Sequence, residues 1–172
     1  MKHLQYPIGP FQRPSALTTD QRQQLIEEIQ TFPTAFRKEG IALAPDQLDQ
    51  TYRPGGWTAR QVIHHVPDSH MNAYIRFKWA LTESGPTIKA YQEDRWAELP
   101  DTRVMPAELS FGLLDALHQR WTTLMHLMED KDWAKTYLHP DGNRIWRLDQ
   151  ALALYAWHGK HHLGHLAIIR EQ

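Results

Sequence analysis

The chain has 172 residues, and its charged side chains nearly balance, with 19 Lys and Arg against 20 Asp and Glu. Its length predicts a single domain over residues 1–172, and the balanced charge argues against nucleic-acid binding, for which a basic excess is typical. The lack of cysteine, of an apolar run long enough for a membrane span and of a secretory signal pattern predicts a cytoplasmic protein without disulfides.

The first half of the chain contains an arm and two predicted helices. Residues 1–17 hold three prolines and a glycine, which predicts an extended arm along the body of the protein. Thr18 and Gln21 form a capping box that begins a first helix. Thr58 and Gln61 form a second capping box, and the helix that they begin can continue to about residue 82.

The second half predicts two further helices, separated by long connections. Residues 85–106 contain three prolines, and loops of this length are usually functional or packed as lids. Residues 110–128 carry apolar side chains at helical spacing, and a turn at His139–Gly142 precedes a last helix that Asp149 could cap. Four amphipathic helices favour an all-α fold, most simply an up-down-up-down four-helix bundle.

Histidines are concentrated in the second and fourth predicted helices. The second helix carries His64, His65 and His70, and the fourth carries His158, His161, His162 and His165. Residues four apart lie on one face of a helix, so either pair of the fourth helix, 158 with 162 or 161 with 165, could chelate a divalent ion. The second helix could supply the third ligand from His64 or His65. Three neutral nitrogens with one open position are typical of catalytic zinc.

Other metal centres would use the same helices. A haem between two axial histidines would need an apolar pocket, which a sequence does not display. A di-iron bundle would need two Glu-x-x-His motifs, and neither histidine-rich helix contains one. The spacing therefore favours a site for one divalent ion.

Two segments together resemble a known family. GGWTARQVIHHVPDSHMNAYIRFK (55–78) and ALALYAWHGKHHLGHL (151–166) are similar to motifs of the YfiT-type metal-dependent hydrolases. These belong to the DinB-like superfamily, which includes bacillithiol S-transferases. The likeness extends over nearly the whole chain, through 6–9, 118–121 and 139–141. It implies a single DinB-like four-helix bundle domain that holds one divalent metal through three histidines.

Matching the motifs residue by residue implies a definite set of ligands, namely His65, His158 and His162. The ion expected is zinc, with nickel as the alternative. This chain departs from the family at Pro67, where relatives carry a small residue. Proline there removes a helical hydrogen bond, so we expect the second helix to bend beside the metal.

Other residues near the expected ligands are assigned smaller roles. Asp68 and His165 each lie three residues after an expected ligand, and either could shuttle protons or orient an imidazole. Arg60, Arg76 and Lys78 could hold an anionic substrate, but we expect them to lie on a solvated face.

The three-histidine site supports more than one function. A metal-dependent hydrolase would use the ion to activate water, and a thiol S-transferase would use it to bind a low-molecular-weight thiol as thiolate. A third possibility is a non-catalytic, metal-stabilised binding protein. The substrate is expected to be a small molecule, enclosed by the loops at about 83–106 and 129–147. The resemblance, and an arm without an obvious partner in its own chain, predict a homodimer.

Overall fold

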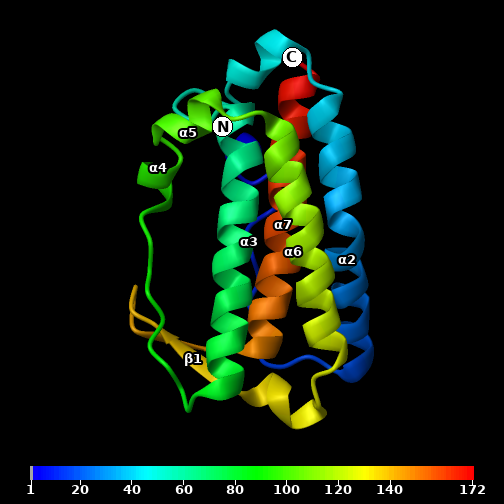
Figure 1. The fold of residues 1–172 in the computed structure, drawn as a ribbon, viewed down its shortest axis with the longest axis vertical. Helices are drawn as coiled ribbons and strands as arrows, with labels where there is room; N and C mark the ends of the chain where they lie inside the picture. Colours follow the sequence, from blue (N-terminus) through cyan, green and yellow to red (C-terminus); the bar gives the residue numbers. More distant parts are fainter. Residues whose placement is uncertain (1) are drawn as a thin grey trace.

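Four long helices pack side by side in the computed structural model, which describes residues 2–172 and, at position 2, the backbone only (Figure 1). They are α2 (Thr19–Ile41), α3 (Ala59–Thr82), α6 (Ala107–His126) and α7 (Leu148–Arg170). The predicted four-helix bundle is confirmed. Among residues 2–172, none of the helices combines the length and the apolar composition that a membrane span requires.

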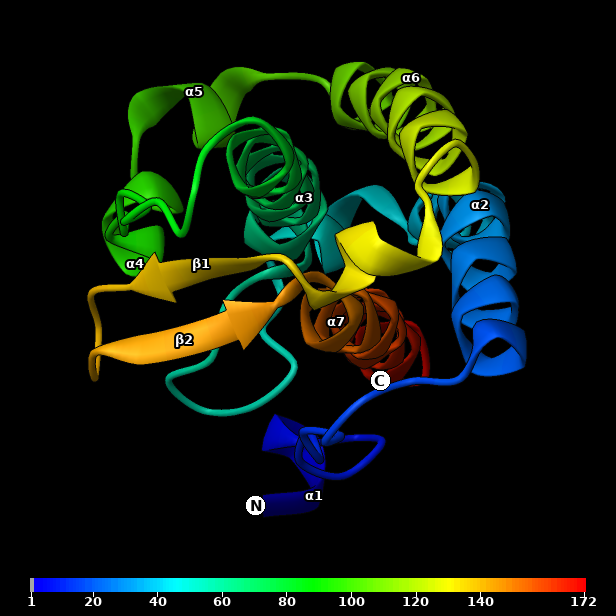
Figure 2. The same ribbon diagram turned by 90° about the horizontal axis from the view of Figure 1, so that it is seen from below.

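Short elements connect the long helices. They are α1 (Lys2–Gln5), η1 (Pro45–Asp49), α4 (Glu93–Trp96), α5 (Pro100–Val104), η2 (Asp130–Ala134), β1 (Thr136–His139) and β2 (Arg144–Arg147). The strands form an antiparallel hairpin beside the start of α7 (Figure 2), which the sequence analysis did not predict. Gly142 and Asn143 adopt positive φ angles of 71° and 49° in its turn. A helical pattern search passes over strands this short, because four residues show little periodicity.

Local sequence signals place the helix starts well. In both predicted capping boxes the threonine hydroxyl accepts the backbone N–H three residues on, and the glutamine side chain accepts the threonine N–H. The sequence analysis expected Asp149 to cap α7, but the structure places this residue in the first turn of the helix. Its carboxylate accepts hydrogen bonds from Arg147 and from the backbone N–H of Leu17 instead.

The helix directions correct the predicted up-down-up-down order. Lys135, just before the hairpin, donates to the carbonyl of Leu81, so the end of α3 lies near the start of α7. Ser110 at the start of α6 bonds to His64 near the start of α3, so α3 and α6 run in the same direction. The order is up-down-down-up (Figure 1). The reason is the connection 83–106, which at roughly 3.3 Å per residue can return along the full length of α3.

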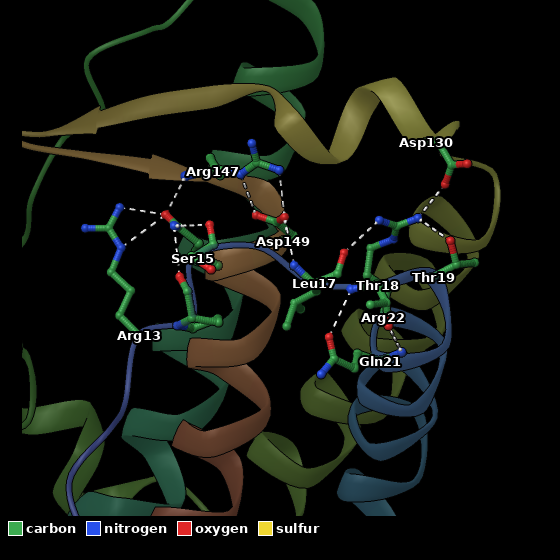
Figure 3. Close-up of polar contacts among 12 residues, drawn as sticks. Arg13, Ser15, Leu17, Thr18, Thr19, Gln21, Arg22, Asp130, Arg147 and Asp149 are labelled. Carbon is green, nitrogen blue, oxygen red and sulfur yellow. Dashed lines mark hydrogen bonds and ion pairs between the residues drawn. The ribbon is translucent and has the colours of Figure 1, made fainter.

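The predicted arm is confirmed from residue 6 onward, although residues 2–5 form a helical turn. It lies along α7 of its own chain, where Trp157 Nε1 donates to the carbonyl of Gly9 over 3.1 Å. Arg13 donates to the Gln150 side chain, which in turn donates to the carbonyls of Pro14 and Ser15 (Figure 3). The expectation of an arm without an internal partner was wrong, because these bonds join residues 135 to 148 positions apart, which a local sequence pattern does not reveal.

A layer of histidines separates two apolar clusters of the bundle interior. One cluster includes Ile29, Phe77 and Trp121, and the other includes Phe36 and Phe111. On α3, α6 and α7 five histidines lie where the residues of one cluster give way to those of the other: the buried His65, His70, His118 and His162, and the partly buried His158. The candidate metal centre therefore lies near the middle of the bundle, between its two apolar clusters. Pro67 lies inside α3, which continues through it from Ala59 to Thr82.

Candidate metal centre

Three of these imidazoles, two buried and one partly buried, converge from two helices. His65 comes from α3, and His158 and His162 lie one turn apart on α7. Each offers one nitrogen, and these atoms all lie within 4.8 Å of one another. The Nε2 atoms of His65 and His158 are 3.3 Å apart, close to the ~3.3–3.4 Å between two nitrogens that share a tetrahedral zinc at about 2.0–2.1 Å. The structure thus brings together the ligands that the resemblance implies, in an arrangement that fits one ion.

Burial keeps this trio uncharged at neutral pH. It lowers the pKa of His65 to about 3, helped by the charge of His161 when that residue is protonated. It lowers the pKa values of His158 and His162 well below the usual range, and the neighbouring imidazoles add to the effect. Neutral imidazoles keep a lone pair for a metal. They also leave the ion its full positive charge.

A chain of hydrogen bonds orients His158. His118 donates from Nδ1 to the carbonyl of Ile29 over 2.7 Å, since a carbonyl can only accept. Its Nε2 therefore accepts from Nδ1 of His70, 2.8 Å away, when these buried rings are neutral. In the same way Nε2 of His70 accepts from Nδ1 of His158 over 3.1 Å. The lone pair of His158 is left on Nε2, the atom that faces His65.

A second, shorter chain orients His162. His165 donates from Nε2 to the carbonyl of Gln5 in α1, at 3.3 Å. Its Nδ1 therefore accepts from Nδ1 of His162, also at 3.3 Å. This leaves the lone pair of His162 on Nε2. Outer hydrogen bonds of this kind fix the tautomer and direction of metal-binding histidines, and here the N-terminal arm supplies one of them.

A second group of histidines could also hold an ion. Nitrogens of His161, His162 and His165 lie within 4.8 Å of one another. However, His165 already uses both of its nitrogens in the chain to Gln5. His161 stacks on Trp157 with ring centroids 4.5 Å apart. The hydrogen bonds therefore favour the trio with His65.

Asp68 lies apart from the histidine trio. Within residues 2–172, no hydrogen bond joins its carboxylate to one of the three. Burial, together with the negative charge of Asp101 in α5, raises the pKa of Asp68 to about 6. Of the two residues expected to shuttle protons or orient an imidazole, the structure therefore brings only His165 into contact with the trio.

Two cavities meet at the histidine trio. The larger, of about 640 Å³, is lined by Arg76, Tyr155 and His158, and the smaller, of about 510 Å³, by the complete trio. Both also reach Glu93 and Asp94, which begin α4. Burial raises the pKa of Glu93. The sequence analysis placed the pocket wall in this connection but did not single out Glu93 and Asp94, because a pair of acidic residues in a loop is typical of any exposed surface.

Comparisons with known proteins agree with this architecture. A family model described as the DinB superfamily matches residues 33–166. Relatives from Bacillus mycoides (strain KBAB4) and Bacillus cereus (strain B4264) are each 48% identical over 172 residues, which is 100% of this chain and 98% of theirs. Both are named "Putative metal-dependent hydrolase".

Solved structures show the same fold. YfiT from Bacillus subtilis, described as "a probable metal-dependent hydrolase with an unusual four-helix bundle topology", is 40% identical with a TM-score of 0.96. The match covers 98% of this chain and 97% of YfiT. A mycothiol-dependent maleylpyruvate isomerase matches 84% of this chain and 60% of its own, with a TM-score of 0.68 and 14% identity. That second likeness is one of fold alone.

Proposed function

This chain belongs to the DinB superfamily, and from that premise we propose that it is a metal-dependent hydrolase with His65, His158 and His162 as its metal ligands. The observation that carries the proposal is the convergence of these three neutral imidazoles at the junction of two cavities. The names of the Bacillus relatives support the same activity.

The ion would supply the electrophilic part of the reaction. A divalent metal on three neutral imidazoles, when bound, lowers the pKa of a coordinated water and polarises a substrate oxygen. We assign zinc, with nickel as the alternative, since both are suited to imidazole ligands. His70 and His118 hold His158 in place, and His165 holds His162.

Glu93 is the residue that we assign to proton transfer, in preference to Asp68. It lines both cavities together with His158. Partial desolvation and the negative charge of Asp94 raise its pKa, which is the direction that favours a general base. It would take a proton from the attacking water and return one to the leaving group as the scissile bond breaks. Glu93→Gln should lower kcat by about 10²–10⁴-fold, whereas Asp68→Asn should leave kcat nearly unchanged.

Transfer of a low-molecular-weight thiol is the second candidate. The observation that favours it is that His158 lines two cavities, because a thiol and an electrophile need separate places beside one ion. A metal ion deprotonates a coordinated thiol, so the same ligands serve this reaction.

A homodimer remains part of the proposal, although the N-terminal arm packs on α7 of its own chain.

Metal analysis followed by two assay panels tests the proposal. The protein, loaded with zinc or nickel, is given p-nitrophenyl esters and anilides in one panel, and cysteine with chlorodinitrobenzene in the other. Turnover in the first panel that disappears in His65→Ala supports hydrolysis, and turnover in the second alone supports thiol transfer. A protein that binds metal but turns over neither would favour the third possibility, a non-catalytic, metal-stabilised protein.

A further inference from the structure

Arg76 is a buried arginine without an acidic partner. It lies on α3 with only 7% of its surface exposed, so the expectation of a solvated face was wrong for this residue. Within the described part of the chain, no carboxylate oxygen lies within 4.0 Å of its guanidinium. Arg60, on the same helix, is by contrast paired with Asp49 over 2.9 Å.

The Arg76 guanidinium is held by one hydrogen bond and keeps further N–H donors for another group. Its Nη1 donates to the hydroxyl of Tyr155 over 3.1 Å, and both residues are buried. An arginine has five N–H donors in a planar fork, so most of them are left for another group. Arg76 is one of the residues that line the larger cavity, of about 640 Å³. Acidic residues on the same cavity wall, Glu93 among them, act on this charge only from a distance, since none is paired with it. A buried charge is stabilised best by a partner in direct contact, and an anion bound to the free donors would be such a partner.

The cavity connects Arg76 to the metal centre. Tyr155 and His158 line the same wall, with ring centroids 5.7 Å apart. A molecule that contacts Arg76 at one end can therefore reach the His158 side of the trio with the other. The volume is that of a site for a small organic molecule.

We infer that Arg76 binds a carboxylate group of the substrate, whose reacting group then lies at the trio of His65, His158 and His162. The guanidinium fork matches a carboxylate in two parallel hydrogen bonds. One guanidinium balances one negative charge, and Glu93, Asp94 and Asp141 on the same cavity wall disfavour a doubly charged phosphate. The inference rests on the proposed function and specifies its substrate as a small organic acid.

Binding of benzoate to the metal-free protein tests the inference, because a carboxylate cannot then coordinate an ion. Benzamide is the neutral probe of the same shape, and ligand-observed NMR gives both dissociation constants. Charge-assisted hydrogen bonds predict that benzoate binds about 10-fold or more tighter than benzamide. Arg76→Met should remove that preference, and Arg60→Met, the matched control on α3, should retain it.

Three results would overturn the inference. They are benzoate binding to Arg76→Met within twofold of the unaltered protein, equal binding of benzamide and benzoate, and tighter binding of inorganic phosphate than of benzoate. If Arg76→Met does not fold by circular dichroism, Arg76→Gln, which keeps a donor for Tyr155, is judged by the same outcomes. Zinc binding is measured separately, so a protein that binds benzoate but no ion contradicts the proposed function, and one that binds zinc but no benzoate contradicts this inference alone.

Discussion

His118 of α6 donates its Nδ1 hydrogen to the backbone carbonyl of Ile29 in α2 over 2.7 Å. Through this bond the backbone of one helix sets the tautomer of a ligand on another. Because His118 donates from Nδ1, its Nε2 accepts from His70, and Nε2 of His70 in turn accepts from Nδ1 of His158. Nε2 of His158 therefore keeps its lone pair for a metal. Three helices besides α7 thus determine how a single ligand presents its lone pair.

Replacing His118 by phenylalanine should weaken metal binding without unfolding the protein. Phenylalanine keeps a ring beside Phe32 but leaves His70 without its acceptor. Loss of such an outer partner typically costs 10–100-fold in metal affinity, and we expect about that loss in zinc competition against a chromophoric chelator. His126→Phe, at an exposed position on the same helix, is the control. Equal zinc affinities of His118→Phe and the unaltered protein would show that the chain does not orient the ligand.

Removing each proposed ligand should empty the metal site. His65→Ala, His158→Ala and His162→Ala should each lose most bound metal in elemental analysis after dialysis, because two imidazoles hold an ion far less tightly than three. His64→Ala should retain it, since His64 bonds to Ser110 instead. His161→Ala should also retain it. If His161→Ala empties the site while His158→Ala does not, the ion is bound by the other histidine group of α7.

Acid should destabilise the metal-free protein from about pH 6.5 downward, near the ordinary pKa of histidine. Burial lowers the pKa of His65 to about 3 and those of His118, His161 and His165 to about 4. Below about pH 6.5 the unfolded chain therefore binds more protons than the folded chain. For each pH unit of acidification, each such histidine lowers the free energy of unfolding by up to about 1.4 kcal/mol. The loss continues down to the folded pKa values and vanishes above about pH 7.

Asp68, with its pKa raised to about 6, opposes this trend below that value, but it is one group against several. Urea unfolding between about pH 8 and pH 5 measures the effect. A free energy of unfolding that stays flat over this range would mean that the histidines are not held neutral in the folded state.

A pair of helical glycines should respond oppositely to alanine. At Gly112 in α6 a β-carbon would have no heavy atom within 4 Å, so Gly112→Ala should stabilise the protein by about 0.5–1 kcal/mol through helix propensity. At Gly40 in α2 the β-carbon would overlap the ring of Phe111, which is buried between α2 and α6. Gly40→Ala should therefore destabilise it by about 1–3 kcal/mol. Thermal unfolding of the two variants side by side would contradict this packing if both shifts had the same sign.

The sequence by itself determined the features that depend on neighbours within a turn or two. The capping boxes at Thr18 and Thr58 place two helix starts, because their hydrogen bonds span three residues. The spacing of His158 and His162 places both on one face of α7, because that distance is fixed by the helix itself. Spacing could not choose between this pair and His161 with His165, and the resemblance made that choice.

The tertiary structure alone decided how distant segments meet. The direction of α6 depends on the path of a 24-residue connection, and the docking of the arm depends on bonds between residues far apart in the chain. Whether Arg76 is solvated or buried depends on the elements that cover its face of α3, and no local pattern encodes their placement. The bond from His118 to Ile29 likewise joins two helices 89 residues apart, so the outer part of the metal centre exists only once the bundle has packed.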